Sequence, residues 1–97
     1  MICTRTHLDN GRKILAACDE DIVGKTFRGD GLRITVSELF YKDRTVTEEE
    51  FSDMMDAASM MNLVGNRTVD FAVKAGYVDE KRILTVGGVK HAQVVKN

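Results

Sequence analysis

The sequence predicts an α+β fold in which an antiparallel or mixed sheet of about three hairpins is covered on one face by two consecutive helices. Three observations support this prediction. Runs of alternating apolar and polar residues, typical of half-buried strands, lie on both sides of a central helical stretch. Glycine-containing pairs that favour tight turns interrupt these runs. Residues 47–76 place apolar residues at the three- and four-residue spacing of helices.

The first helix is predicted over residues 48–61. Thr47 and Glu50 have the spacing of a capping box, in which the hydroxyl accepts from the Glu50 amide and the carboxylate reaches back. One apolar stripe at helical spacing follows, formed by Phe51, Met54, Met55, Ala58 and Met61.

Two residues near the end of this helix do not fit the stripe. Met60 lies about half a turn away from it, at roughly 100° per residue. It is either an ordinary exposed methionine or a contact with a partner. Asn62 is interpreted as a left-handed cap that ends the helix. The alternative is a buried amide that needs hydrogen-bond partners.

The second helix is predicted over residues 66–75, after a turn at residues 63–66. Its apolar residues cover most of the circumference, so we expect it to be packed on more than one side. Asp70 precedes Lys74 by four residues, in the order that favours a helical ion pair. Gly76 ends the helix.

The first hairpin joins residues 2–8 to residues 12–18, and its register decides the distance between two cysteines. A two-residue turn at Asn10-Gly11 places Cys3 opposite Cys18, whereas a three-residue loop places Cys3 opposite Ala17. The second register gathers the apolar residues on one face, and register follows the buried face. It is therefore preferred, and it forbids a disulfide.

The rest of the chain is predicted to form two more hairpins and two connections. Residues 19–24 are expected to form a helical turn capped by Asp19. Residues 37–46 are expected to form a loop that exposes the aromatic pair Phe40-Tyr41. The strands of the two hairpins are predicted at residues 25–28 and 32–36, and at residues 82–86 and 89–95 around Gly87-Gly88.

Composition predicts a single globular domain over residues 1–97. The sequence is 43% hydrophobic and 30% charged, which is ordinary for a folded protein. No apolar run is long enough to span a bilayer, and the first residues lack a signal-peptide core, so a cytoplasmic protein without a membrane partner is expected. The net charge of −1 argues against coating of nucleic acid through bulk charge.

Most motifs that would carry chemistry are incomplete. Gly24-Lys25-Thr26 imitates the end of a phosphate-binding loop, but Asp19 stands where the first glycine is needed. The cysteines and histidines lack the close pairing of zinc ligands, so neither a metal nor a cofactor is expected. His91 follows a glycine pair and could transfer a proton, although a structural histidine is the simpler interpretation.

Three ordered motifs carry a family resemblance: residues 16–20 leading to 24–27, residues 62–67, and residues 87–93. In this order and spacing they resemble a small archaeal family of uncharacterised proteins, the domain-of-unknown-function family numbered 424. The family usually has a proline where this chain has Lys90. The resemblance implies an archaeal, cytoplasmic, single-domain protein with an expected link to translation, and it brings no established activity, cofactor or catalytic residue. The positions that match the motifs are Gly24, Lys25, Asn62, Gly65, Arg67, His91 and Gln93.

The leading functional hypothesis is a non-enzymatic binding module that contacts RNA or a ribonucleoprotein. Its candidate contacts combine positive charge with hydrogen-bonding side chains: Lys25, Arg67, Lys90, His91 and Gln93. The alternative is a protein-interaction module or homodimer that uses Phe40, Tyr41 and Met60. A second alternative is a small-molecule enzyme with His91 as acid or base.

Overall fold

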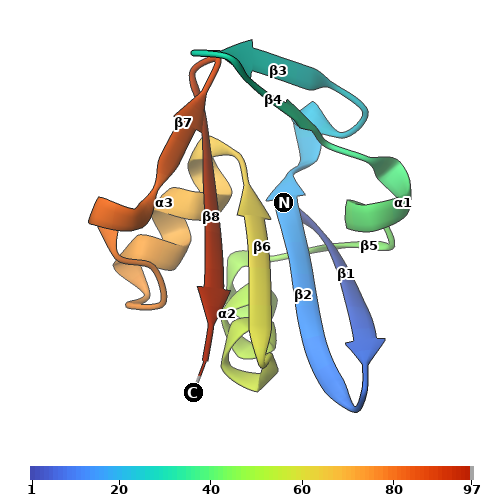
Figure 1. Ribbon diagram of the computed structural model, residues 1–97. Coiled ribbons are helices and arrows are strands. Elements are labelled where there is room, and N and C mark those ends of the chain that lie inside the picture. The colour runs from blue at the N-terminus through green and yellow to red at the C-terminus, as the bar shows by residue number, and fades with distance from the viewer. Residues whose placement is uncertain (97) are drawn as a thin grey trace.

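The computed structural model describes residues 1–96, which build a six-stranded mixed sheet and a separate two-stranded hairpin (Figure 1). In the order in which they lie in the sheet, the strands are β5 (Arg44–Val46), β1 (Ile2–Asp9), β2 (Arg12–Asp19), β6 (Met60–Val64), β8 (Val89–Val95) and β7 (Leu84–Val86). Only the central pair, β2 and β6, is parallel.

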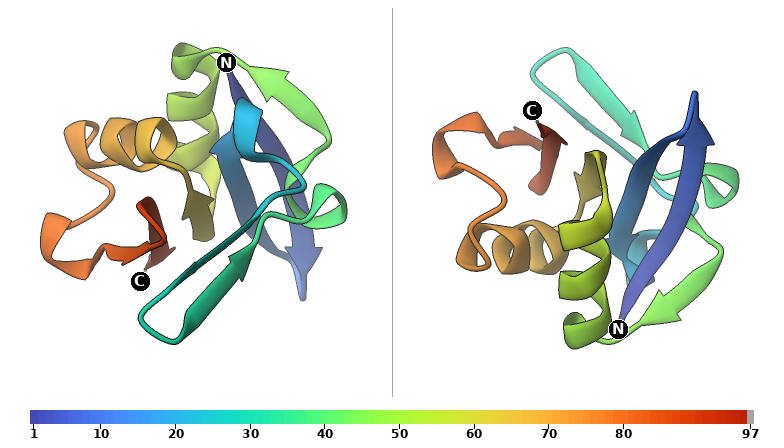
Figure 2. Two further views of the ribbon diagram at one scale, coloured as in Figure 1. Left: turned by 90° about the horizontal axis from the view of Figure 1, so that it is seen from above. Right: turned by 90° about the horizontal axis from the view of Figure 1, so that it is seen from below.

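The two longer helices cover one face of the sheet, called the helical face below (Figure 2). These are α2 (Glu48–Ala57) and α3 (Asn66–Lys74). The other face is covered at one end by the hairpin of β3 (Thr26–Gly29) and β4 (Leu32–Thr35), and by the short helix α1 (Glu38–Tyr41). Within residues 1–96, no helix is long and apolar enough to cross a membrane.

The predicted α+β class, the three hairpins and the packing of two helices on one face are confirmed. The capping box at Thr47 and Glu50 begins α2 as expected, with both hydrogen bonds at 3.1 Å. The third hairpin is shorter than predicted, because residues 80–82 form a 3₁₀ turn before β7.

The predicted helix over residues 48–61 is too long. It ends at Ala57, and Met60–Val64 form β6 in the middle of the sheet. A central strand that is packed on both faces need not alternate between apolar and polar residues, so its sequence can imitate the end of a helix. Asn62 therefore lies in a strand and does not cap a helix, and residues 63–66 are not a turn.

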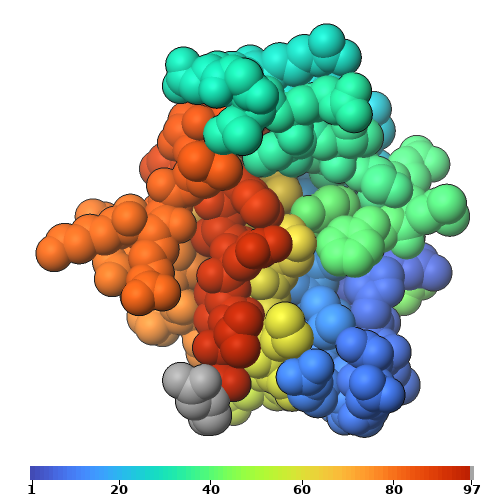
Figure 3. All heavy atoms as spheres, in the orientation of Figure 1, coloured from blue at the N-terminus to red at the C-terminus, as the bar shows by residue number. Residues whose placement is uncertain are grey.

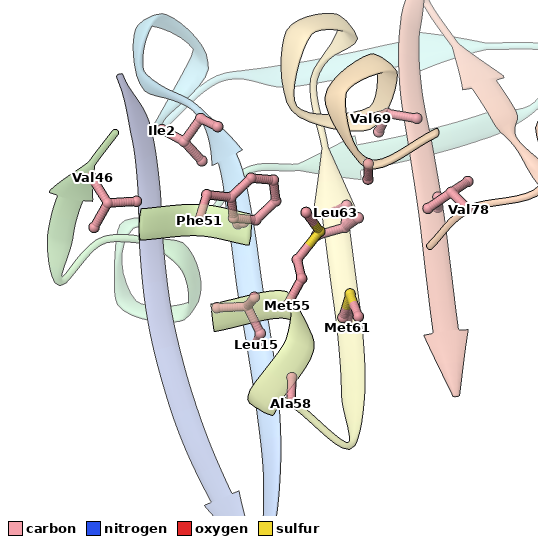
Figure 4. Close-up of a cluster of buried hydrophobic side chains, with 13 residues drawn as sticks. Ile2, Leu15, Val46, Phe51, Met55, Ala58, Met61, Leu63, Val69 and Val78 are labelled. Atoms are coloured by element: carbon pink, nitrogen blue, oxygen red, sulfur yellow. The ribbon is translucent and has the colours of Figure 1, made fainter. Parts of the chain in front are cut away.

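The main core lies between the helices and the sheet. Figure 4 shows Phe51 and Met55 of α2 directed at Leu15 of β2 and Leu63 of β6. All four side chains are fully buried. Burial of side chains of this size stabilises the fold by roughly 1.5–3 kcal/mol each.

The preferred register of the first hairpin is wrong. Asn10 and Gly11 both have positive φ and form a two-residue turn, so Cys3 lies directly opposite Cys18. The prediction assumed that only one face of the hairpin is buried. Instead, β2 directs Leu15 into the helical core and Cys18 into a second core on the other face. Both cysteines are buried free thiols.

The segment predicted as a loop at residues 37–46 contains α1 and β5. Tyr41 is only 5% exposed, because its ring packs in the second core with Cys18 and Val36. The prediction that this tyrosine is exposed is therefore wrong. Phe40 beside it is half-buried.

Asp19 caps a different helix from the one predicted. It precedes the 3₁₀ turn at Glu20–Ile22 without capping it through its side chain. Its carboxylate instead accepts hydrogen bonds at the start of α3, from Thr68 N at 2.8 Å, Thr68 Oγ1 at 2.7 Å and Arg67 N at 3.2 Å. Asp19 at the end of β2 lies close to the start of α3, which follows β6. The reason is that β2 and β6 are adjacent parallel strands, whose carboxyl ends lie at the same edge of the sheet.

Gly65 leaves the space that this carboxylate occupies. It has a φ of 114°, and a Cβ atom there would lie 2.4–2.8 Å from the carboxylate atoms of Asp19. Gly76, which follows α3, also has positive φ, but nothing lies within 4 Å of its Cβ position.

We expect Gly65→Ala to lower the free energy of unfolding by on the order of 3–5 kcal/mol. This sum combines backbone strain of ~1–3 kcal/mol with the loss of hydrogen bonds to a charged group. Gly76→Ala, which adds the strain of a positive φ without a clash, should cost only ~1–2 kcal/mol. Urea denaturation of both variants measures the difference, and equal losses would contradict a cap that depends on the space at Gly65.

Candidate nucleic-acid interface

The face opposite α2 and α3 is open to solvent away from the β3–β4 hairpin. Figure 3 looks onto this open face, where β8, β6 and α1 lie beside one another below the hairpin. Strand register and side-chain alternation assign the side chains of this surface. They are Arg5, His7, Ile14, Met60, Asn62, His91, Gln93 and Val95.

Polar groups of the open face gather on its two central strands. Asn62 of β6 pairs with Gln93 of β8, and His91 lies two residues before Gln93 on the same side of β8. Gln93 is exposed, whereas Asn62 and His91 are half-buried. The three side chains therefore form one polar group at the centre of the sheet.

A hydrogen-bond network fixes the orientation of His91. Asn62 Oδ1 can only accept, so the two groups that contact it donate. They are Tyr41 OH at 2.7 Å and His91 Nε2 at 3.1 Å. The hydrogen of a neutral His91 is thus on Nε2, which leaves Nδ1 as an acceptor.

Burial keeps the network in its neutral form. Desolvation lowers the pKa of His91, so the ring is uncharged at neutral pH. Burial, with a smaller contribution from Cys18, raises the pKa of Tyr41 to about 12, so the phenol remains a donor. A ligand could donate a hydrogen bond to Nδ1 of His91 and accept one from the side-chain amide of Asn62. Asn62 connects Tyr41 to His91 and, as an amide, does not transfer protons, so the network does not relay a proton between them.

An aromatic pair stands at the rim of the open face. His7 of β1 stacks on Phe40 of α1 with ring centroids 4.6 Å apart and an interplanar angle of 20°. His7 Nε2 also donates to the carbonyl oxygen of Phe40 at 2.8 Å, which holds α1 against β1. Both residues are half-buried, so their rings are partly accessible.

The structure brings together only part of the predicted RNA-binding set. His91 and Gln93 share the open face. Lys90 points to the helical face, where its Nζ lies 2.6 Å from Asp70 Oδ1. Arg67, in the first turn of α3, pairs with Asp21 at 3.6 Å. Lys25 is exposed just before β3.

Among the predicted interaction residues, Phe40 and Met60 lie at or on the open face and are half-buried. Tyr41 is buried, and its hydroxyl donates a hydrogen bond to Asn62 of the network. Sequence reasoning missed His7, whose partner Phe40 is 33 residues away along the chain. Asn62 could have been recognised as a strand residue, because it lies inside the apolar run Met60–Val64 directly before Gly65.

Within residues 1–96, no cluster of three or more His, Cys, Asp or Glu side chains could hold a metal ion.

The lowered pKa of His91 should make stability depend on pH. The unfolded chain takes up a proton near pH 6.5 and the folded chain only at lower pH. Between these two values the unfolded state binds more protons, so stability falls as the pH drops below about 6.5.

We expect the wild-type protein to lose more stability between pH 7 and pH 5 than His91→Gln, which retains a hydrogen-bond donor but does not titrate. The free energy of unfolding in urea is measured for both proteins at both pH values. The difference between the two proteins then excludes the pH dependence of the titratable groups that they share. Equal losses would show that His91 is not desolvated in the fold.

The fold is shared with a protein of known structure. The crystal structure of an uncharacterized conserved protein from Methanopyrus kandleri superposes with a TM-score of 0.77 at 23% sequence identity. The match covers 99% of this chain and 93% of the other. A search of curated proteins finds no match.

The family model described as "Protein of unknown function (DUF424)" matches residues 6–96, in agreement with the resemblance carried by the three sequence motifs. The match includes β2, β6 and β8 in full and residues 6–9 of β1. The chain therefore belongs to the DUF424 family.

Proposed function

We propose that this chain is a non-enzymatic, cytoplasmic module that binds single-stranded RNA, free or within a ribonucleoprotein, on the open face of its sheet. The observation that carries the proposal is the network in which Asn62 orients His91 beside the exposed Gln93. The implied archaeal origin and link to translation are consistent with such a role.

The open face matches what single-stranded RNA offers. Unstacked bases are recognised by hydrogen bonds along their edges and by stacking on aromatic rings. His91, Asn62 and Gln93 supply neutral donors and acceptors, and the His7–Phe40 pair supplies ring surface at the rim. A double helix hides its base edges, so the same face has little to recognise in a duplex.

Candidate phosphate contacts lie on other surfaces as well as on this face. Arg5 lies on it, with Nη1 donating to the carbonyl oxygen of Lys42 at 3.1 Å. Lys25, Arg67 and Lys90 lie on other surfaces and remain candidate phosphate contacts. Contacts to phosphate carry no sequence information, so specificity for the bases has to come from the neutral groups.

We expect labelled single-stranded RNA to bind more tightly than a duplex of the same sequence, with an affinity that falls as salt increases. His91→Ala and Gln93→Ala should each weaken binding roughly fivefold, the worth of one hydrogen bond of about 1 kcal/mol. Fluorescence anisotropy measures all of these affinities.

The matched control is Thr85→Ala, which truncates an exposed strand residue on the helical face and should leave affinity unchanged. Absence of binding to any RNA, or equal losses in all three variants, would rule out the open face as the RNA site.

A second candidate is homodimerisation through the same side of the molecule. Leu39 of α1 is 84% exposed next to Phe40, and Val95 at the end of β8 is 62% exposed. Met60 is the direct cross-strand partner of Val95. Apolar side chains of this kind gain free energy when they are buried against a partner.

If the protein dimerises through this surface, Leu39→Glu should convert the dimer to a monomer in analytical ultracentrifugation. Leu8→Glu, at a leucine of the β1–β2 hairpin that is 75% exposed, should leave the dimer intact. A wild-type protein that stays monomeric at high concentration would eliminate this candidate.

A further inference from the structure

Two arginines face each other on the β3–β4 hairpin. Arg28 and Arg33 are direct cross-strand partners. Their neighbours Phe27 and Ile34 point inward, toward the second core. Side chains alternate along a strand, so both arginines point outward, and both are exposed.

The positive charges of this pair are not balanced by a neighbouring acid. Within residues 1–96, the ion pairs involve Arg44, Arg67 and Lys90, and neither Arg28 nor Arg33. Asp30, in the turn between the strands, pairs with neither of them. Like charges directly opposite each other destabilise an antiparallel pair. A local conflict of this kind is expected where a sequence serves a function other than folding.

The hairpin holds the two arginines on a rigid base. A Cβ atom at Gly29 would lie 2.7 Å from Gly87 N, so the backbones of the hairpin and the β7–β8 turn are in close contact. On the outer face, Thr26 and Thr35 are joined by a hydrogen bond of 3.0 Å between their hydroxyl oxygens. A shallow surface depression at the tip of the hairpin is lined by Arg28, Gly29, Gly31, Leu32 and Arg33.

We propose that Arg28 and Arg33 together bind a phosphate group that bridges their guanidinium groups. A guanidinium presents planar N–H donors that match phosphate oxygens in pairs. Cross-strand side chains begin about 5 Å apart, so two such forks reach one tetrahedral anion. The bound anion also removes the repulsion between the arginines.

This site goes beyond the proposed function, because the arginines lie on the hairpin and not among the side chains of the open face. The phosphate belongs either to the backbone of a nucleic acid or to a small phosphorylated molecule. Both present the same chemistry to the two guanidinium groups, and the experiment separates them.

The test titrates ¹⁵N-labelled protein with inorganic pyrophosphate, at an ionic strength held constant with chloride, and follows the arginine Nε–Hε signals. We expect saturable shifts of Arg28 and Arg33. The double variant Arg28→Gln/Arg33→Gln should weaken binding at least tenfold. The control Arg12→Gln/Lys13→Gln removes two charges from the other hairpin and should bind like the wild type.

Thermal unfolding supplies a second readout. Without pyrophosphate, the Arg28→Gln/Arg33→Gln variant should melt at or above the wild-type temperature, because the repulsion is gone. With pyrophosphate, the wild type should melt at a higher temperature and the variant should not respond. Shifts that do not saturate, or an equal response in wild type and variant, would overturn the proposal.

Binding of single-stranded RNA identifies the source of the phosphate. If the arginines hold an RNA backbone, the slope of log affinity against log salt should decrease in magnitude by ~0.7 in the double variant, because the pair neutralises one phosphate. An unchanged slope with saturable pyrophosphate binding assigns the site to a small phosphorylated molecule. If no RNA binds, the open-face proposal fails and the pyrophosphate titration still decides this site.

Discussion

The contact between the Asp19 carboxylate and the first turn of α3 is the interaction on which the centre of this fold depends. It joins the end of β2 to the helix that follows β6, and so connects the only strand pair that is parallel within residues 1–96. Hydrogen bonds to a carboxylate are about twice as strong as neutral ones, and here they satisfy amides that a helix start leaves open. The missing side chain of Gly65 makes this contact sterically possible.

Features fixed by neighbouring residues could be predicted from the sequence. The capping box of α2, the extent of α3 and the positions of the three hairpins depend on spacings of a few residues. Two of the errors concern segments that are packed on both sides. The helical pattern of residues 48–61 runs into β6, and alternation favours the wrong register of β1 against β2, because both patterns indicate one buried face and one solvent-exposed face.

The candidate site was only partly predictable for the same reason. His91 and Gln93 could be singled out because strand alternation places both on one face. Their relation to Asn62 and Tyr41 depends on three segments that meet only in the folded chain, so no local pattern reports it. Charge alone was a poor guide, since Arg67 and Lys90 each have an acidic partner that is distant in sequence.

The single parallel pair also has a consequence for how the chain folds. The hairpins β1–β2 and β7–β8 can form from local contacts, but the sheet is completed only when β6 enters between β2 and β8. Residues 20–59 separate β2 from β6. Before β6 can pair, this segment has to place the β3–β4 hairpin and α1 on one face of the sheet, β5 beside β1, and α2 on the other face. Pairing across so long a segment has a large entropic cost before any contact compensates it. The entry of β6 is therefore expected to limit the folding rate, with both hairpins formed before it.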